Sequence, residues 1–190
     1  ELWSKMAGQG WQGLLIPEVY GGVGFDFLDL CVLLEEFGRA LVPGPFMSTV
    51  LGGAVPLMEI GSDAQKSELL PRIASGDLIF TLAQTEPSAR FDEEGIQAQA
   101  TVNGDEVTVS GTKLFVPDAN VADYMVVAGR SPQGVTLAII PTDQTGVTAA
   151  VAAALMARFA RARAPERPWL VYQRTSGTPR RRAQGAAASA

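Results

Sequence analysis

The sequence predicts an α+β protein in which a helical amino-terminal domain, residues 1–77, precedes a small antiparallel β domain, residues 78–148. Three observations lead to this prediction. Apolar residues recur at every third or fourth position before residue 78 and at every second position after it, which are the periods of a helix and of a strand. The third observation is a change of composition near residue 150, which separates a tail of residues 149–190.

Charge divides the chain at the same place. Residues 1–150 hold seven Lys and Arg against nineteen Asp and Glu, whereas residues 151–190 hold eight Arg and one acidic residue, Glu166. This segment is also rich in Ala, Pro and Gly. Binding to nucleic acid or to a membrane surface, disorder, and out-of-frame translation of a GC-rich gene are the open interpretations; the lack of interleaved aromatic residues favours the last two.

The absence of His and the scarcity of Cys limit the reaction types and the metal sites that this sequence can support. The sequence contains no His, which excludes Ser-His and Cys-His nucleophile activation and most sets of metal ligands. The single Cys31 lies in an apolar helical pattern and is expected to be buried and reduced. No stretch is long and apolar enough to span a membrane, and no secretory signal is evident, so we expect a cytoplasmic protein. The chain starts without Met inside a helical pattern, and we expect the natural amino terminus to lie upstream.

Helical segments are expected throughout the amino-terminal domain. Residues 46–60 form an apolar helix interrupted at Pro56, and this helix is hydrophobic enough to pack between other elements. Ser62 and Gln65 have the spacing of a capping box for the next helix, after which Pro71 is expected to begin a separate turn.

The β domain begins with a hairpin. Residues 96–102 alternate between apolar and polar side chains, and Val107 and Val109 resume the alternation. Between them, Asn103-Gly104 is a dipeptide that a type I′ turn prefers. The further strands expected are residues 124–128 and 135–140.

The hairpin is expected to bring two segments together, one ending in Thr85-Glu86-Pro87 and the other containing Phe115. A flat aromatic cofactor such as a flavin needs an apolar stacking surface, and hydrogen-bond donors at the ring edge where negative charge collects on reduction. Phe115 can supply the surface, and Thr85 with nearby backbone N–H groups can supply the donors. The alternative is that both are ordinary core or turn residues.

Several motifs then follow one another in order. In the β domain they are Leu82-Ala83-Gln84-Thr85-Glu86-Pro87, Asp92-Glu93-Glu94-Gly95-Ile96, Val109-Ser110-Gly111-Thr112-Lys113-Leu114-Phe115-Val116, and residues 122–128; before it they are residues 10–18, 20–24 and 61–76. Together they resemble the amino-terminal and middle domains of the acyl-CoA dehydrogenase family, over about residues 1–148. In this family the Gly-rich loop of residues 11–24 either lines the acyl channel or is an ordered connection between domains.

The resemblance implies a fold and an activity. The fold is a helical amino-terminal domain followed by a small antiparallel β-barrel, here with a non-homologous tail. The activity is the FAD-dependent removal of an α proton and a β hydride from an acyl-CoA in fatty acid or lipid metabolism, with an electron-transfer flavoprotein as the electron acceptor. Homo- or hetero-oligomers are implied, and neither a nucleic-acid partner nor a membrane span.

The resemblance also implies roles for individual residues. The implied flavin-binding residues are Leu82, Gln84, Thr85, Phe115, Val116 and Pro117. Phe91 stands in the substrate-binding position usually held by a Ser, and bulky Arg90 stands where the family has Gly. Pro117 replaces a residue that often carries a hydroxyl, and it also lacks a backbone N–H.

Two functions remain open. The carboxy-terminal helical bundle of the family, with its Glu base, does not follow in this sequence, and Glu86 is expected to be a structural acid because it precedes a proline on an extended loop. The first hypothesis is a truncated acyl-CoA dehydrogenase that has no catalytic residue and binds FAD weakly or not at all. The second is a non-catalytic binding subunit that pairs with a complete acyl-CoA dehydrogenase.

Overall fold

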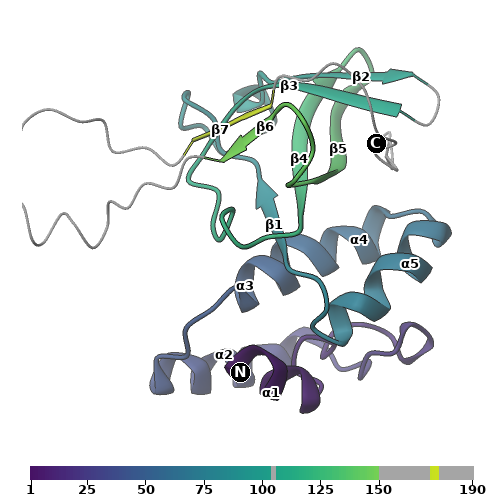
Figure 1. Cartoon of the computed structure of the whole chain (residues 1–190), viewed down its shortest axis with the longest axis vertical. Helices are drawn as coiled ribbons and strands as arrows, with labels where there is room; N and C mark the ends of the chain where they lie inside the picture. Colours follow the sequence, from purple (N-terminus) through teal and green to yellow (C-terminus); the bar gives the residue numbers. More distant parts are fainter. Residues whose placement is uncertain (104–105, 150–171, 176–190) are drawn as a thin grey trace, which may run out of the picture.

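A computed structural model describes residues 1–103, 106–149 and 172–175, and in it a group of helices packs against a mixed β-sheet (Figure 1). The helices and helical turns are α1 (Leu2–Gly8), η1 (Glu18–Tyr20), α2 (Phe27–Ala40), α3 (Phe46–Thr49), η2 (Val50–Ala54), α4 (Val55–Ile60), α5 (Asp63–Ala74) and η3 (Glu93–Gly95). The strands are β1 (Phe80–Ala83), β2 (Gln99–Asn103), β3 (Glu106–Leu114), β4 (Tyr124–Ser131), β5 (Gly134–Pro141), β6 (Val147–Ala149) and β7 (Tyr172–Thr175). Of the tail predicted for residues 149–190, only residue 149 and residues 172–175 are among those described.

The first helices form a core of their own. Its buried members are Met6, Leu14, Leu15, Leu30, Phe37, Phe46 and Val50. Helix α2 begins where Asp26 accepts hydrogen bonds from the N–H groups of Leu28 and Asp29, and the Asp29 carboxylate bonds back to the Asp26 N–H. Cys31 is exposed, so the expectation of a buried thiol was wrong: it lies on the side of α2 away from Leu30, and no described element covers it.

Residues 46–60 form one helical run, α3–η2–α4, rather than a helix broken at Pro56. The middle turn, η2, is π-helical, and Pro56 follows it in the first turn of α4. Pro56 cannot donate the backbone hydrogen bond that a regular helix would have here, and the π-helical turn that precedes it accommodates this gap within the run. The expected placement between other elements is confirmed, since Thr49, Val50 and Ala54 are buried.

Helix α5 also continues through its proline. The capping box of Ser62 and Gln65 is confirmed, but Pro71 lies inside α5 and does not begin a separate turn. Burial explains the difference, because Leu70 and Ile73 on either side of Pro71 are fully buried, and this packing offsets the ~3 kcal/mol that an interior proline costs a helix.

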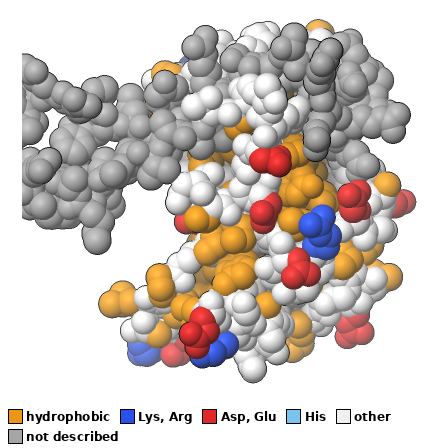
Figure 2. Space-filling model, viewed as in Figure 1, with side chains coloured by type: hydrophobic (Ala, Val, Ile, Leu, Met, Phe, Trp, Pro, Cys, Tyr) orange, Lys and Arg blue, Asp and Glu red, His pale blue; other side chains and the backbone are white. Residues whose placement is uncertain are grey.

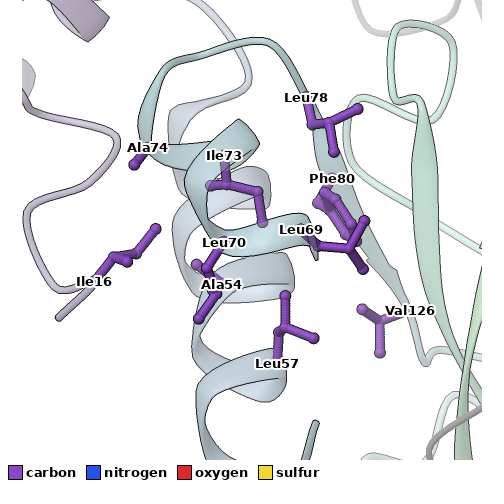
Figure 3. Close-up of a cluster of buried hydrophobic side chains, with 10 residues drawn as sticks. All are labelled: Ile16, Ala54, Leu57, Leu69, Leu70, Ile73, Ala74, Leu78, Phe80 and Val126. Atoms are coloured by element: carbon purple, nitrogen blue, oxygen red, sulfur yellow. The ribbon is translucent and has the colours of Figure 1, made fainter. Parts of the chain in front are cut away.

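A second core joins the helices to the sheet (Figure 3). It combines Ile16 of the Gly-rich loop with residues of α4, α5, β1 and β4, and its buried members are Ile16, Ala54, Leu57, Leu69, Leu70, Ile73, Ala74, Leu78, Phe80 and Val126. In Figure 3 the side chains of Leu57, Leu69 and Phe80 approach from both sides of the junction. The helical part and the sheet therefore share one hydrophobic core.

The sheet is mixed, so the prediction of a purely antiparallel domain was wrong. Strand β1 pairs with β4 in parallel over four residues, and β2 meets β4 in parallel at Gln99 and Arg130. The pairs β2–β3, β4–β5, β3–β7 and β6–β7 are antiparallel. Between β1 and β4 the chain passes through the hairpin and a turn, which returns β4 in the direction of β1. The strand pairings do not close the described part of the sheet into a barrel, so the barrel expectation is not confirmed.

The predicted hairpin is confirmed by the register of β2 and β3, in which Asn103 pairs with Glu106. Gly104, part of the predicted turn, lies outside the described residues. Within the tail predicted for residues 149–190, Tyr172–Thr175 forms β7, which pairs with both β3 and β6. Among the described helices none is long and apolar enough to cross a bilayer.

Replacing Gly53 by Ala should destabilise the junction between η2 and β1. A Cβ atom on Gly53 would lie 2.2 Å from the Cβ of Phe80, so one of the two backbones must move. We expect Gly53→Ala to lower the free energy of unfolding by about 1–3 kcal/mol in urea titrations. The matched control is Gly38→Ala in α2, where no atom lies within 4 Å of the added Cβ. It should stabilise by up to about 1 kcal/mol; equal effects of both substitutions would contradict the account.

Candidate functional site

The ends of β1 and β3 lie next to each other, as the sequence predicted. The Leu114 N–H donates a 2.8 Å hydrogen bond to the carbonyl of Thr85, which places Phe115 one residue from that contact. Thr85 is half-buried and its hydroxyl has no hydrogen bond to another described residue, while the Phe115 side chain is 64% exposed. The two segments therefore present an available hydroxyl and an open aromatic ring; their role toward a flavin remains a prediction.

A buried ion pair lies directly beneath this contact. The Glu86 side chain is 5% exposed and that of Lys113 1% exposed, and Lys113 Nζ lies 2.6 Å from Glu86 Oε1. The same carboxylate accepts hydrogen bonds from the N–H groups of Gln97 (2.9 Å) and Ala98 (3.0 Å), and Lys113 also donates to the carbonyl of Gln84. Three chain segments thus meet at one carboxylate.

This arrangement settles the part that Glu86 plays. Burial lowers the pKa of Lys113, and the hydrogen bond and charge of Glu86 oppose that shift. A carboxylate that is only 5% exposed and is held by an ammonium group and two backbone N–H groups is not accessible to a substrate. Glu86 is therefore a structural acid, as expected.

The chain then makes a turn at residues 115–118 that displays Phe115. Phe115 and Asp118 both have left-handed backbones, with φ of 51° and 52°, which few non-glycine residues adopt. Between them, the Val116 side chain is buried in the core of the sheet, so only its backbone is available to a ligand. Pro117 is exposed, and its carbonyl accepts a hydrogen bond from the Thr81 hydroxyl. Phe115 is thus the one aromatic member of this turn, and its ring is open to solvent.

A pocket of about 570 Å³ opens beside Gln84, between α4 and the sheet. Its walls are mostly apolar, with two amide and two carboxylate side chains among them; the lining residues are Pro56, Leu82, Gln84, Asp92, Glu93, Ile96, Ala128, Gln133, Gly134, Val135 and Leu137. A smaller hollow of about 20 Å³, with a wholly apolar lining, shares Pro56 and Leu137 with it. The volume and the lining are typical of a site for a small apolar ligand with a polar end.

The rim of this pocket is formed by the loop before β2. Arg90 pairs with Asp92 and Glu94, each at 2.6 Å, and the hydrogen bond from Arg90 holds the pKa of Asp92 below its usual range. Phe91 is 79% exposed and does not line the pocket, although its neighbour Asp92 does. The Gly-rich loop of residues 11–24 contributes to neither pocket, and its backbone hydrogen bonds support an ordered connection.

The residues present fit part of a flavin. Phe115 offers a stacking face and Thr85 an edge hydroxyl, whereas Pro117 has no N–H and its carbonyl is already bonded. Leu82 and Gln84 line the pocket, whereas Thr85, Phe115 and Pro117 are not among its lining residues. Among the described residues no group of three or more His, Cys, Asp or Glu is arranged to hold a metal ion.

Several residues of the pocket and of the buried ion pair were not predicted from the sequence. The pocket walls of β4 and β5, such as Ala128 and Leu137, have the same alternating pattern as core residues, and no local signal distinguishes them. Lys113 carried a usable signal. It continues the inward-facing positions Val107, Val109 and Gly111, and a lysine on an inward face requires a buried acid.

Two family models match most of the chain. Residues 1–77 match the family model "Acyl-CoA dehydrogenase, N-terminal domain", and residues 81–163 match "Acyl-CoA dehydrogenase, middle domain". The second match extends beyond residue 148, where the sequence motifs end.

Curated relatives include acyl-CoA dehydrogenase FadE26 of Mycobacterium tuberculosis, 34% identical over 75% of this chain and 38% of the relative, and probable acyl-CoA dehydrogenase YngJ of Bacillus subtilis, 33% identical over 78% and 41%. Two similar solved structures are the "Tcur3481-Tcur3483 steroid ACAD" (30% identical, TM-score 0.78) and the ChsE4-ChsE5 complex of M. tuberculosis (29%, 0.80). Each alignment covers 98% of this chain and 47% of the solved chain. The chain therefore spans about two fifths of the length of the curated relatives that it matches.

Removing one member of the buried ion pair should be more harmful than removing both. Lys113→Met leaves the Glu86 carboxylate buried beside two backbone N–H groups only, and we expect a loss of about 3–5 kcal/mol in the free energy of unfolding. In the double variant with Glu86→Gln the loss should be smaller, because no charge is left buried. Urea titrations measure all three proteins.

The control is Lys5→Met, because Lys5 pairs with Glu1 at the surface, where the two side chains are 71% and 86% exposed. It should change stability by less than about 1 kcal/mol. A double variant that is less stable than Lys113→Met would show that the pair does not act through its buried charge.

Proposed function

The chain belongs to the acyl-CoA dehydrogenase family, and from that membership we propose that it forms the flavin edge and the substrate groove of an FAD-dependent acyl-CoA dehydrogenase. The activity is α,β-dehydrogenation of an acyl-CoA thioester, with electrons passing to an electron-transfer flavoprotein. We place the catalytic base outside the residues that the structure describes, and we propose that these residues do not turn over alone.

One observation carries the proposal. The hydrogen bond between Leu114 and Thr85 brings together the segments that carry a free hydroxyl and an open aromatic ring, and Gln84, which precedes Thr85 in the chain, lines a largely apolar pocket. A flavin enzyme that oxidises a thioester needs these two features next to each other, because the ring must meet both its own edge donors and the substrate.

The chain's own residues divide the work as follows. Thr85 donates a hydrogen bond at the cofactor edge, and Phe115 covers one face and excludes water from it. Leu82, Ala128 and Leu137 bury the apolar part of the acyl group in the pocket. FAD, when bound, supplies the acceptor for the β hydride.

Abstraction of the α proton must come from outside the described residues. Glu86 is held by Lys113, and the two carboxylates in the pocket wall, Asp92 and Glu93, face Arg90 at 2.6 Å and Arg130 at 3.7 Å. A base needs an accessible carboxylate of suitable pKa next to the substrate. We propose that the base lies in a part of the family fold that the structure does not describe.

A second candidate is a non-catalytic subunit that pairs with a complete acyl-CoA dehydrogenase. The observation in its favour is that two structures similar to this chain, at 29–30% identity, are described as assemblies with two named components. The encoding DNA separates the candidates. If a one-base shift near codon 147 restores a helical bundle with an inward Glu, the chain is an interrupted dehydrogenase; if it does not, the subunit hypothesis is favoured.

The purified chain should bind FAD weakly, because it supplies only one side of the site. After gel filtration we expect less than stoichiometric flavin absorbance, and in titrations monitored by flavin fluorescence Phe115→Leu and Thr85→Val should each weaken the remaining binding about 3- to 10-fold. The control is Phe25→Leu, an exposed aromatic of the helical domain, which should have no effect. A stable yellow protein with one flavin per chain would contradict the proposal that the chain supplies only one side of the flavin site. Equal FAD binding by all variants would contradict the roles proposed for Thr85 and Phe115.

A further inference from the structure

The turn that displays Phe115 is held from the helical domain as well as from the sheet. Ser48 of α3 is 6% exposed, and its hydroxyl donates a 2.6 Å hydrogen bond to the carboxylate of Asp118, 70 residues away in the chain. On the other side the Thr81 hydroxyl of β1 bonds to the Pro117 carbonyl. Helix α3 and strand β1 therefore each fix one residue of the same short turn.

The backbone of this turn needs such support. Phe115 and Asp118 both occupy the left-handed region, which costs about 1–3 kcal/mol for a residue with a side chain and persists only where surrounding contacts enforce it. Phe is a poor residue for this conformation, whereas Asp tolerates it. The strain at Phe115 has a visible result: its ring stays 64% exposed while the next side chain, Val116, enters the core.

The Ser48–Asp118 contact is strong for a hydrogen bond between side chains. The acceptor is a carboxylate and the distance is short, as in charge-assisted hydrogen bonds. Ser48 Oγ lies farther from its other neighbour, the Pro45 carbonyl at 3.0 Å, and a hydroxyl has one proton to give. The backbone carbonyl of Asp118 accepts hydrogen bonds from the N–H groups of Val121 and Ala122, and these bonds fix the far end of the turn.

We propose that Ser48 and Asp118 are positioning residues, which hold the Phe115 ring at the cofactor face by locking the left-handed turn to helix α3. Neither residue touches the cofactor itself. This role rests on the proposed function in one respect, namely that Phe115 is the stacking surface. A consequence is that movement of α3 relative to the sheet would reach Phe115 directly.

The test follows the Phe115 ring by ¹⁹F NMR, and its first stage needs no cofactor. All eight Phe residues are replaced by 4-fluorophenylalanine, and the ¹⁹F resonance of Phe115 is assigned by its loss in Phe115→Leu. Three variants follow. Ser48→Ala removes the donor, Asp118→Gly removes the acceptor but relieves the left-handed backbone, and Asp118→Asn keeps both an acceptor oxygen and a tolerance for that backbone.

We expect a single Phe115 resonance in the unmodified chain and in Asp118→Asn, and a second or broadened resonance in Ser48→Ala and Asp118→Gly, with the other seven unchanged. A single Phe115 resonance in Asp118→Asn but not in Asp118→Gly would show that the hydrogen bond to Ser48 orders the ring, and that relief of backbone strain does not. If the Phe115 resonance is the same in all four proteins, the inference is overturned. If Ser48→Ala disturbs all eight resonances, the comparison of Asp118→Gly with Asp118→Asn decides.

Adding millimolar FAD separates this inference from the proposed function. A shift of the Phe115 resonance that is present in the unmodified chain and lost in Ser48→Ala supports both. A Phe115 resonance that depends on Ser48 but does not shift with FAD would support the positioning role of Ser48 and would contradict the stacking of Phe115 on the flavin. An FAD-induced shift of the Phe115 resonance that is equal in the unmodified chain and in Ser48→Ala would support the stacking of Phe115 on the flavin and would contradict the positioning role of Ser48.

Discussion

The site depends on one buried carboxylate. Glu86 binds the ammonium group of Lys113 and the N–H groups of Gln97 and Ala98, so that the end of β1, the start of β2 and the end of β3 are fixed relative to one another. In an interior of low dielectric these charge-assisted bonds are strong only as a complete set. Because Glu86 follows Thr85 directly and Lys113 lies two residues before Phe115, these bonds restrict the positions of Thr85 and Phe115. The same requirement removes Glu86 from any role in proton transfer.

The second constraint is the close approach of helix and strand. Gly53 in η2 leaves room for Phe80, and Thr49 exchanges hydrogen bonds with the Phe80 backbone at 3.2 and 3.4 Å. Through these contacts β1 is part of both the helical core and the sheet. Figure 2 shows hydrophobic side chains gathered where the helices meet the sheet. The pocket therefore has one wall from α4 and another from β1, and both elements contribute to the same hydrophobic core.

Local patterns predicted the elements well and their arrangement less well. The capping box at Ser62, the hairpin register beyond Asn103 and the meeting of Thr85 with the Phe115 segment all follow from short-range signals. The parallel pairing of β1 with β4 could not be predicted from alternation, because alternation is the same for both strand directions. Pro56 and Pro71 were expected to break helices, but tertiary packing overrode local preference. The left-handed turn at Phe115 left no sequence signal, since it is enforced by Ser48 and Thr81 from distant parts of the chain.

The central claim is that the segments around Thr85 and Phe115 form one flavin-facing surface. Amide chemical-shift mapping of the ¹⁵N-labelled chain with added FAD tests it most directly, because it reports on every backbone N–H at once. The account predicts that the amides of Gln84, Thr85, Phe115 and Val116 shift together with one saturation curve, while those of α2 stay in place. Shifts confined to α1 and α2, or shifts at Thr85 without shifts at Phe115, would contradict it.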